Sequence, residues 1–225
     1  MIVYIADTSE PDEKIIELMK SALPEQRRMQ MAKLKKPSDR VNSAVAAYLV
    51  FYALVKNQSN EGLVYPETDS LLESRDEISE LAARLGWPTE HGKPFPSGIE
   101  VNGRHYHVNI SHSERLVGAA ISDRPVGIDI QRIPRISISR LERIACRFHA
   151  LELERLKGMP KNRYAAEFCR LWVCKESVLK LCGKGLSVPL SSFCITENDT
   201  CIIDGNTVKI TVYELPDAYL AVSKY

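Results

Sequence analysis

The sequence predicts an α+β fold built from two similar α+β halves, each a small antiparallel sheet with a long packing helix, related by a pseudo-two-fold axis. Apolar residues recur with the helical period in some segments and alternate with the period of strands in others. Residues 104–110 and 115–122 have strand-like patterns joined by the short polar stretch SHSE, which is typical of adjacent antiparallel strands. Two long helical segments also share a pattern of apolar positions, which suggests a repeated half.

The individual elements follow from these two periodicities. Strands are predicted at 2–6, 104–110, 115–122, 126–131, 192–195, 207–213 and 218–223. Helices are predicted at about 12–22, 39–57, 74–85, 138–157 and 161–181. The stretch EHGKPFPSG, residues 90–98, is rich in Gly and Pro and is predicted to be an ordered loop.

The two longest helices match each other when Pro37 is aligned with Pro160. Their apolar positions then coincide along most of both segments, although two unrelated amphipathic helices could also match in this way. We predict a division near residues 123–125 into halves 1–124 and 125–225.

Charge and cysteine content exclude several classes of protein. Lys and Arg number 30 and Asp and Glu number 29, so the net charge does not indicate a polyanionic partner. The N-terminus lacks the pattern of a signal peptide, and no apolar run has membrane-spanning length. The six cysteines include no C-x-x-C pair and are expected to be buried, reduced thiols, which favours a cytoplasmic protein.

The helical stretch WVCKESVLK, residues 172–180, carries charges within an apolar pattern. Trp172, Glu176 and Lys180 follow one another at one-turn intervals, and Lys175 leans toward the apolar side. One interpretation is an ordinary surface ion pair between Glu176 and Lys180, worth a few tenths of a kcal/mol. The other is that the charges have a function on a helix that is otherwise built for burial.

The predicted strand PVGIDIQ places a carboxylate at a costly position. Val126, Ile128 and Ile130 should face one side, whereas Gly127, Asp129 and Gln131 face the other. Aspartate is disfavoured in strands and needs a partner when buried. The candidates for that partner are a cation, a metal ion or a set of backbone donors, and the purely structural alternative is an ion pair with Arg132 or Arg135.

Other polar residues allow both a structural and a functional interpretation. Ser111 and His112 lie at the end of a strand, where a histidine and backbone amides can hold a phosphate, but such histidines also serve only as capping residues. Lys93 stands between Gly92 and Pro94, and most such lysines are simply solvated. A basic run from Arg27 to Arg40 is either a solvated helix face or an anion-binding surface.

Taken in order, these motifs resemble a known family. The chain contains G-K-P at 92–94, N-I-S-H-S at 109–113, G-I-D-I at 127–130, W-x-x-K-E-S-x-x-K at 172–180 and G-K-G-L at 183–186. This series resembles the 4′-phosphopantetheinyl transferase superfamily, and specifically its surfactin-type class of long, monomeric and pseudo-duplicated enzymes.

The resemblance implies a Mg²⁺-dependent enzyme that transfers phosphopantetheine from coenzyme A to a serine of an apo acyl or peptidyl carrier protein. It implies a metal site formed by Asp129, Glu176 and Gln131. It also implies catalytic roles for Glu176 as base, Lys180 at the diphosphate and His112 at a phosphate. Coenzyme A would be bound by Lys93, Pro94, Ser111, His112, Lys180 and Arg40.

Two departures leave alternatives open. Gln131 stands where many relatives have a third carboxylate, so we expect more water on the metal, and a non-catalytic paralogue that binds coenzyme A or a carrier is the main alternative. Gln26 and Met29 stand near positions often occupied by lysine. A nucleic-acid-binding role for residues 27–40 is disfavoured, because aromatic residues are not interleaved with the basic ones. We expect neither a nucleic acid nor a membrane as partner.

Overall fold

The computed structural model describes residues 1–56, 62–90 and 93–225, except for the side chain of Leu186. The chain divides into two compact units, Met1–Pro125 and Val126–Tyr225. Each unit contains a mainly antiparallel sheet and a long helix, so the predicted α+β class is confirmed.

The sheet of the first unit has five strands in the order β2-β1-β7-β6-β5. These strands are β1 (Ile2–Asp7), β2 (Gly62–Val64), β5 (Ile99–Val101), β6 (Arg104–Ser113) and β7 (Leu116–Ser122). Only the β1–β2 pair is parallel among these pairings. A separate two-stranded pair joins β3 (Thr89–Glu90) to β4 (Lys93–Pro94), and β4 lies against β6.

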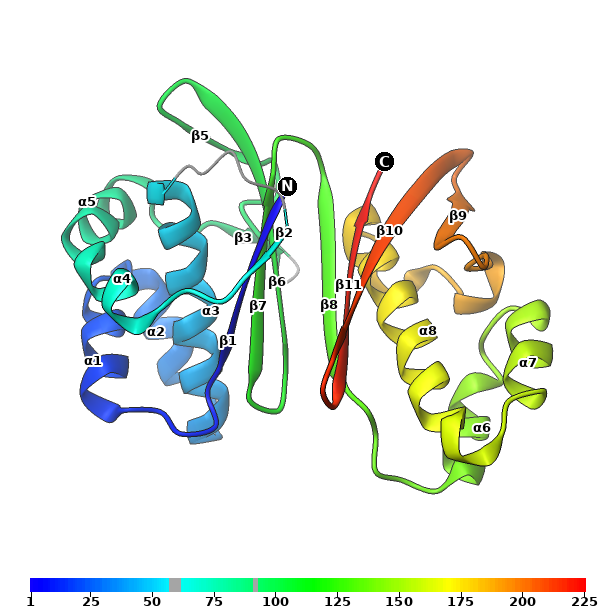
Figure 1. The fold of residues 1–225 in the computed structure, drawn as a ribbon. Helices are drawn as coiled ribbons and strands as arrows, with labels where there is room; N and C mark the ends of the chain where they lie inside the picture. Colours follow the sequence, from blue (N-terminus) through cyan, green and yellow to red (C-terminus); the bar gives the residue numbers. More distant parts are fainter. Residues whose placement is uncertain (57–61, 91–92) are drawn as a thin grey trace. The chain divides into compact units, whose positions relative to one another are not determined.

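Helix α3 (Pro37–Lys56) packs on this sheet and is buried on all sides from Asn42 to Leu54. Figure 1 shows the other helices of the unit on the same face of the sheet as α3. They are α1 (Glu13–Ser21), α2 (Glu25–Ala32), α4 (Thr68–Glu73) and α5 (Arg75–Leu85). Because α3 is apolar around its whole circumference, it needs cover from both the sheet and these helices.

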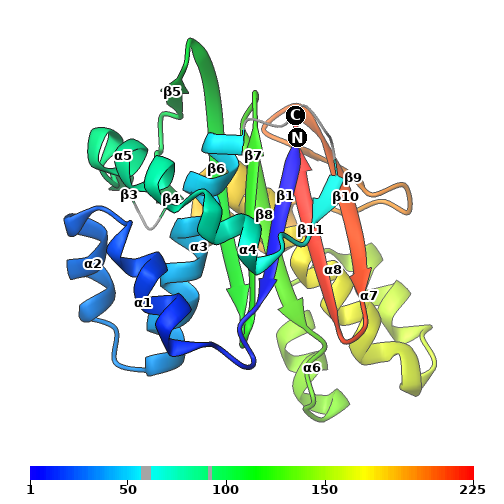
Figure 2. The same cartoon turned by 60° about the vertical axis from the view of Figure 1, so that its left-hand side comes forward.

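The second unit has a four-stranded antiparallel sheet in the order β8-β11-β10-β9. Its strands are β8 (Val126–Arg132), β9 (Thr200–Ile203), β10 (Asn206–Leu215) and β11 (Ala218–Lys224). Helix α8 (Lys161–Cys182) packs on β8 and β11, as Figure 2 shows. Helix α8 ends at Gly183, whose φ of 68° is the left-handed conformation that favours glycine, and this explains the first glycine of G-K-G-L.

Three predictions about elements are wrong. Residues 138–157 form two helices, α6 (Ile138–Ala145) and α7 (Ala150–Lys157), because His149 caps α7 in a capping box with Glu152. Residues 192–195 are not a strand: Ser192 ends the 3₁₀ turn η2 (Leu190–Ser192), and backbone groups of Phe193 and Ile195 bond to side chains instead. Residues 111–113 of SHSE extend β6, leaving Glu114 and Arg115 as the turn.

Several short elements escaped the periodicity analysis because they hold too few residues to show a period. They are α2, α4, β2, β3, β4, β5, β9, η2 and the 3₁₀ turn η1 (Gly185–Ser187). All six cysteines are free; Cys169, Cys174 and Cys201 are buried as expected, whereas Cys182 and Cys194 are half-buried and Cys146 is exposed. Across the described part of the chain, no helix is long and apolar enough to cross a membrane.

Candidate functional site

The first group of predicted site residues lies where β8 meets α8 in the second unit. A Cβ atom added to Gly127 would lie 2.0 Å from the carbonyl oxygen of Ser177 and 2.4 Å from the backbone nitrogen of Leu181. Only glycine therefore allows the strand to approach the helix this closely. Because side chains alternate along a strand, Asp129 and Gln131 point to the same side as Gly127, toward α8.

Asp129 is paired with Lys180 across this strand–helix contact. The Nζ atom of Lys180 donates a hydrogen bond to Oδ1 of Asp129 over 2.7 Å. The Asp129 side chain is only 10% exposed and that of Lys180 is 31% exposed, so the pair is partly shielded from water. Arg132, an alternative partner in the sequence analysis, forms an ion pair with Asp217.

Glu176 is the third residue of this cluster, because the charges of Asp129 and Lys180 affect its pKa. Burial raises the pKa of the Glu176 carboxyl group above its ordinary value, the negative charge of Asp129 raises it further, and Lys180 acts in the opposite direction. A carboxylate whose pKa is raised by burial and by a second acid is well suited to accept a proton or bind a cation. The interpretation of WVCKESVLK as a simple surface pair is thus incomplete, since Lys180 reaches the neighbouring strand.

Gln131 lies two residues after Asp129, on the same face of β8. Its Nε2 atom donates a hydrogen bond to the carbonyl oxygen of Arg132 over 3.4 Å. The residue borders a small, largely apolar cavity of about 180 Å³. The other residues that line this cavity are Pro134, Ile136, Leu141, Ile144, Phe168 and Trp172.

The cluster suits a divalent cation that is completed by phosphate oxygens and water. Within the described residues, no group of three or more His, Cys, Asp or Glu side chains is arranged to hold a metal ion. Magnesium in phosphate-handling sites is usually held by one or two carboxylates together with substrate oxygens. Asp129 and Glu176, which interact electrostatically and come from different elements, fit that smaller ligand set.

In the first unit, Lys93 and Pro94 form β4, and Ser111 and His112 lie near the end of β6. Alternation along β6 places Ser111 and His112 on opposite faces of the sheet. The two residues therefore cannot present their side chains to one phosphate from the same face.

Sequence analysis did not single out His105 and His107, which lie on β6, the strand against which β4 and Lys93 pack. Their rings make an edge contact with centroids 4.9 Å apart. Burial lowers the pKa of His107, with further lowering from His105 and Lys93, and Asp123 opposes the shift. Burial also lowers the pKa of Lys93. The spacing H-x-H on a strand was the available signal, because residues two apart share a face.

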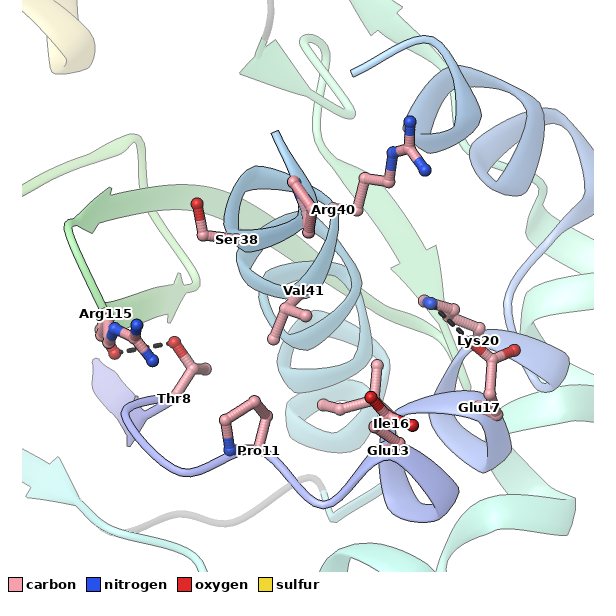
Figure 3. A pocket seen from close by; sticks show the side chains of 11 residues that line it. Thr8, Pro11, Glu13, Ile16, Glu17, Lys20, Ser38, Arg40, Val41 and Arg115 are labelled. Atoms are coloured by element: carbon pink, nitrogen blue, oxygen red, sulfur yellow. Dashed lines mark hydrogen bonds and ion pairs between the residues drawn. The ribbon is translucent and has the colours of Figure 1, made fainter. Parts of the chain in front are cut away.

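Arg40 lines a cavity of about 560 Å³ between α1 and the start of α3, shown in Figure 3. Its Nε atom donates a hydrogen bond to the carbonyl oxygen of Leu34 over 2.8 Å. The residues around this cavity are Thr8, Pro11, Glu13, Ile16, Glu17, Lys20, Pro37, Ser38, Arg40, Val41 and Arg115. This lining mixes acids and bases, and none of the other predicted coenzyme A ligands is among its residues.

Arg27, the first residue of the basic run, has a structural environment. Its guanidinium group donates hydrogen bonds to the carbonyl and hydroxyl oxygens of Ser43 over 3.2 and 2.8 Å. The group stacks over the Trp87 ring, with the Cζ atom 4.8 Å from the ring centroid. Burial lowers the pKa of Arg27 to about 10. The basic run is therefore not a uniformly solvated face.

Comparison with known proteins places the second unit in a family context. Residues 125–214 match the model of the 4′-phosphopantetheinyl transferase superfamily. The predicted resemblance to this superfamily is confirmed. The match contains the β8–α8 cluster, with Asp129, Gln131, Glu176 and Lys180.

Individual phosphopantetheinyl transferases are also similar to the chain. The 4′-phosphopantetheinyl transferase gsp of Aneurinibacillus migulanus is 39% identical over 128 residues, which cover 56% of this chain and 50% of that protein. The 4′-phosphopantetheinyl transferase Sfp of Bacillus subtilis (strain 168) is 36% identical over 130 residues, covering 58% of this chain and 51% of that protein. The chain thus spans about half the length of the curated relatives it matches.

Proposed function

We propose that the chain transfers the 4′-phosphopantetheine group of coenzyme A to a serine hydroxyl of an acyl or peptidyl carrier protein. The observation that carries this proposal is the convergence of Asp129, Glu176 and Lys180 from a strand and a helix within the matched residues. In this reaction the serine oxygen forms a bond to the phosphorus that bears pantetheine. The P–O bond of the diphosphate breaks, and adenosine 3′,5′-bisphosphate leaves with its electron pair.

The cluster supplies the groups that this transfer needs. Asp129 and Glu176 would hold Mg²⁺, with Gln131 contributing directly or through water, and the ion would neutralise the charge of the diphosphate. Glu176 would accept the proton of the carrier serine, and its raised pKa favours that role near neutral pH. Lys180, which is paired with Asp129, would donate hydrogen bonds to the diphosphate as negative charge develops on the leaving side.

The first unit would bind the nucleotide part of coenzyme A. By resemblance, Lys93 and Pro94 with Arg40 would contact the adenine side, and Ser111 and His112 the phosphates. Because Ser111 and His112 face opposite sides of the sheet, we assign the phosphate contact to the side chain of only one of them, with the other contributing backbone groups. The two halves 1–124 and 125–225 would be related by pseudo-two-fold symmetry in a cytoplasmic monomer.

A non-catalytic paralogue that binds coenzyme A or a carrier is the second candidate, and Gln131 is the residue that favours it. A transferase and a non-catalytic paralogue can be distinguished by one product, the modified carrier protein. Only the enzyme converts an apo carrier protein to its phosphopantetheinylated form.

The test is mass spectrometry of apo carrier proteins incubated with the protein, coenzyme A and Mg²⁺. A gain of one phosphopantetheine per carrier is expected, and Glu176→Gln and Asp129→Ala should each lower turnover by about 10²- to 10⁴-fold. Asp204→Asn is the matched control, because it removes a carboxylate that is paired with Lys184 on the surface, outside the cluster. Wild-type protein that modifies no carrier from fatty-acid, polyketide or peptide assembly would favour the paralogue.

A further inference from the structure

Lys175 directly precedes Glu176, yet it points away from the cluster into the core of the second unit. Its side chain is 0% exposed. The Nζ atom donates to the carbonyl oxygens of Leu190 and Phe193 over 2.7 and 2.8 Å, and lies 2.8 Å from Oε2 of Glu152. These three acceptors match the three protons of an ammonium group, so its hydrogen-bonding capacity is filled.

Glu152 connects the same point to two further segments. Its Oε2 atom accepts a hydrogen bond from the backbone nitrogen of His149 over 3.0 Å, and its Oε1 atom accepts one from that of Ile195 over 2.7 Å. The Glu152 side chain is only 1% exposed. The start of α7, the middle of α8 and residues 190–195 therefore meet at a single buried ion pair.

This pair holds α8 on the side opposite to Gly127. Successive residues of an α-helix point about 100° apart, so fixing Lys175 also fixes the direction of Glu176. On the other side, the backbone around Ser177 rests against Gly127 with no space for a methyl group. Helix α8 is thus held at Lys175 and at Ser177. Glu176 lies between these two residues, and Lys180 lies about one turn further along the helix.

We propose that Lys175, through its pair with Glu152, is a positioning residue that sets the rotation of α8 and thereby aims Glu176 at Asp129. A buried polar network whose hydrogen bonds are all satisfied makes the surrounding core rigid and specifies one arrangement of it. This inference rests on the proposed function for its catalytic consequence. Its geometric consequence, the pairing of two carboxylates for a cation, does not depend on which substrate is used.

The test compares Lys175→Met with Ile203→Ala, a core change in β9 away from the cluster. Loss of one partner of a buried ion pair and truncation of a buried isoleucine both destabilise, so this control matches the loss of stability. Both proteins are studied at a temperature where circular dichroism shows them fully folded. Binding of Mn²⁺ to the substrate-free protein is followed by electron paramagnetic resonance, and kcat and the carrier KM are measured with Mg²⁺.

Lys175→Met is expected to lower kcat by about 10- to 100-fold and to weaken Mn²⁺ binding, with the carrier KM unchanged. Ile203→Ala should leave all three quantities within about twofold of wild type, since it moves no group of the cluster. Glu152→Gln, which keeps the size of the side chain but removes its charge, should give an intermediate loss and serves if Lys175→Met does not fold.

Folded Lys175→Met or Glu152→Gln protein with wild-type Mn²⁺ affinity and kcat would overturn the positioning role. An equal loss in Ile203→Ala would overturn it as well, because general destabilisation would then explain the effect. A wild-type protein that modifies no carrier would instead count against the proposed function, and the Mn²⁺ comparison would still decide the role of Lys175.

Discussion

The contact between β8 and α8 gives the sharpest prediction, which concerns Gly127→Ala. The new Cβ atom would stand 2.0 Å from the carbonyl oxygen of Ser177, whereas real Cβ contacts essentially never fall below 3.0 Å. The strand or the helix must therefore move by about 1 Å, and neither obstacle is a flexible side chain. Overpacking usually costs about 1 to 3 kcal/mol, and a backbone obstacle places this site at the upper end, about 3 kcal/mol.

Urea unfolding of the second unit measures this cost. Trp172 reports on that unit, and Trp87→Phe in the background of every variant removes the other tryptophan. With a denaturant slope of roughly 2 kcal/mol per molar urea, Gly127→Ala should lower the unfolding midpoint by about 1.5 M. The shift should also weaken the pairing of Lys180 with Asp129, because both lie beside the same contact.

Gly158→Ala is the matched control. Gly158 has φ −76° and ψ −8°, and its added Cβ atom would meet only backbone oxygens at 3.6 Å or more. That substitution should be neutral or stabilising by up to about 1 kcal/mol, since it restricts the unfolded chain. If Gly127→Ala unfolded within about 0.5 kcal/mol of Gly158→Ala, the reasoning from close strand–helix approach would be refuted.

Two further predictions concern the carboxylates of the cluster. Because folding raises the pKa of Glu176, its ionisation opposes folding, and the wild-type protein gains stability from this group as pH falls through that pKa. In EDTA, Glu176→Gln should therefore have a higher Tm than the wild-type protein at about pH 7, and the two Tm values should converge near about pH 4. Equal Tm values at neutral pH would contradict a raised pKa of Glu176. Gln131→Glu adds a third carboxylate on the face of Asp129, so it should lower the Mg²⁺ concentration that gives half-maximal transfer; an unchanged Mg²⁺ requirement would show that this position does not face the ion.

The long elements were predictable because each repeats its period several times. Strands β1, β6, β7, β8, β10 and β11 and helices α1, α3, α5 and α8 were expected close to their observed bounds. The break between α6 and α7 could not be predicted from the sequence, since the apolar pattern continues through residues 146–149. The side chain of Glu152, a residue of α7, completes the N-terminal capping box that makes α7 a separate helix.

The wrongly predicted strand at 192–195 is a buried segment whose apolar pattern resembles that of a strand. Phe193 and Ile195 are buried, as residues of a half-buried strand would be. Their backbone groups, however, bond to Lys175 and Glu152 rather than to another strand. Both partners are distant in the sequence, so no local pattern could have revealed them.

The sequence by itself determined the periodic elements and the chemical types at the β8–α8 site, because residue spacing fixes which side chains share a strand face or a helix edge. Only the tertiary structure decided which charges meet. Lys180 pairs with Asp129 on β8, while Lys175 turns inward to Glu152. Two lysines five residues apart thus have different roles, because they point to different sides of α8 and meet partners from segments that are distant in the sequence.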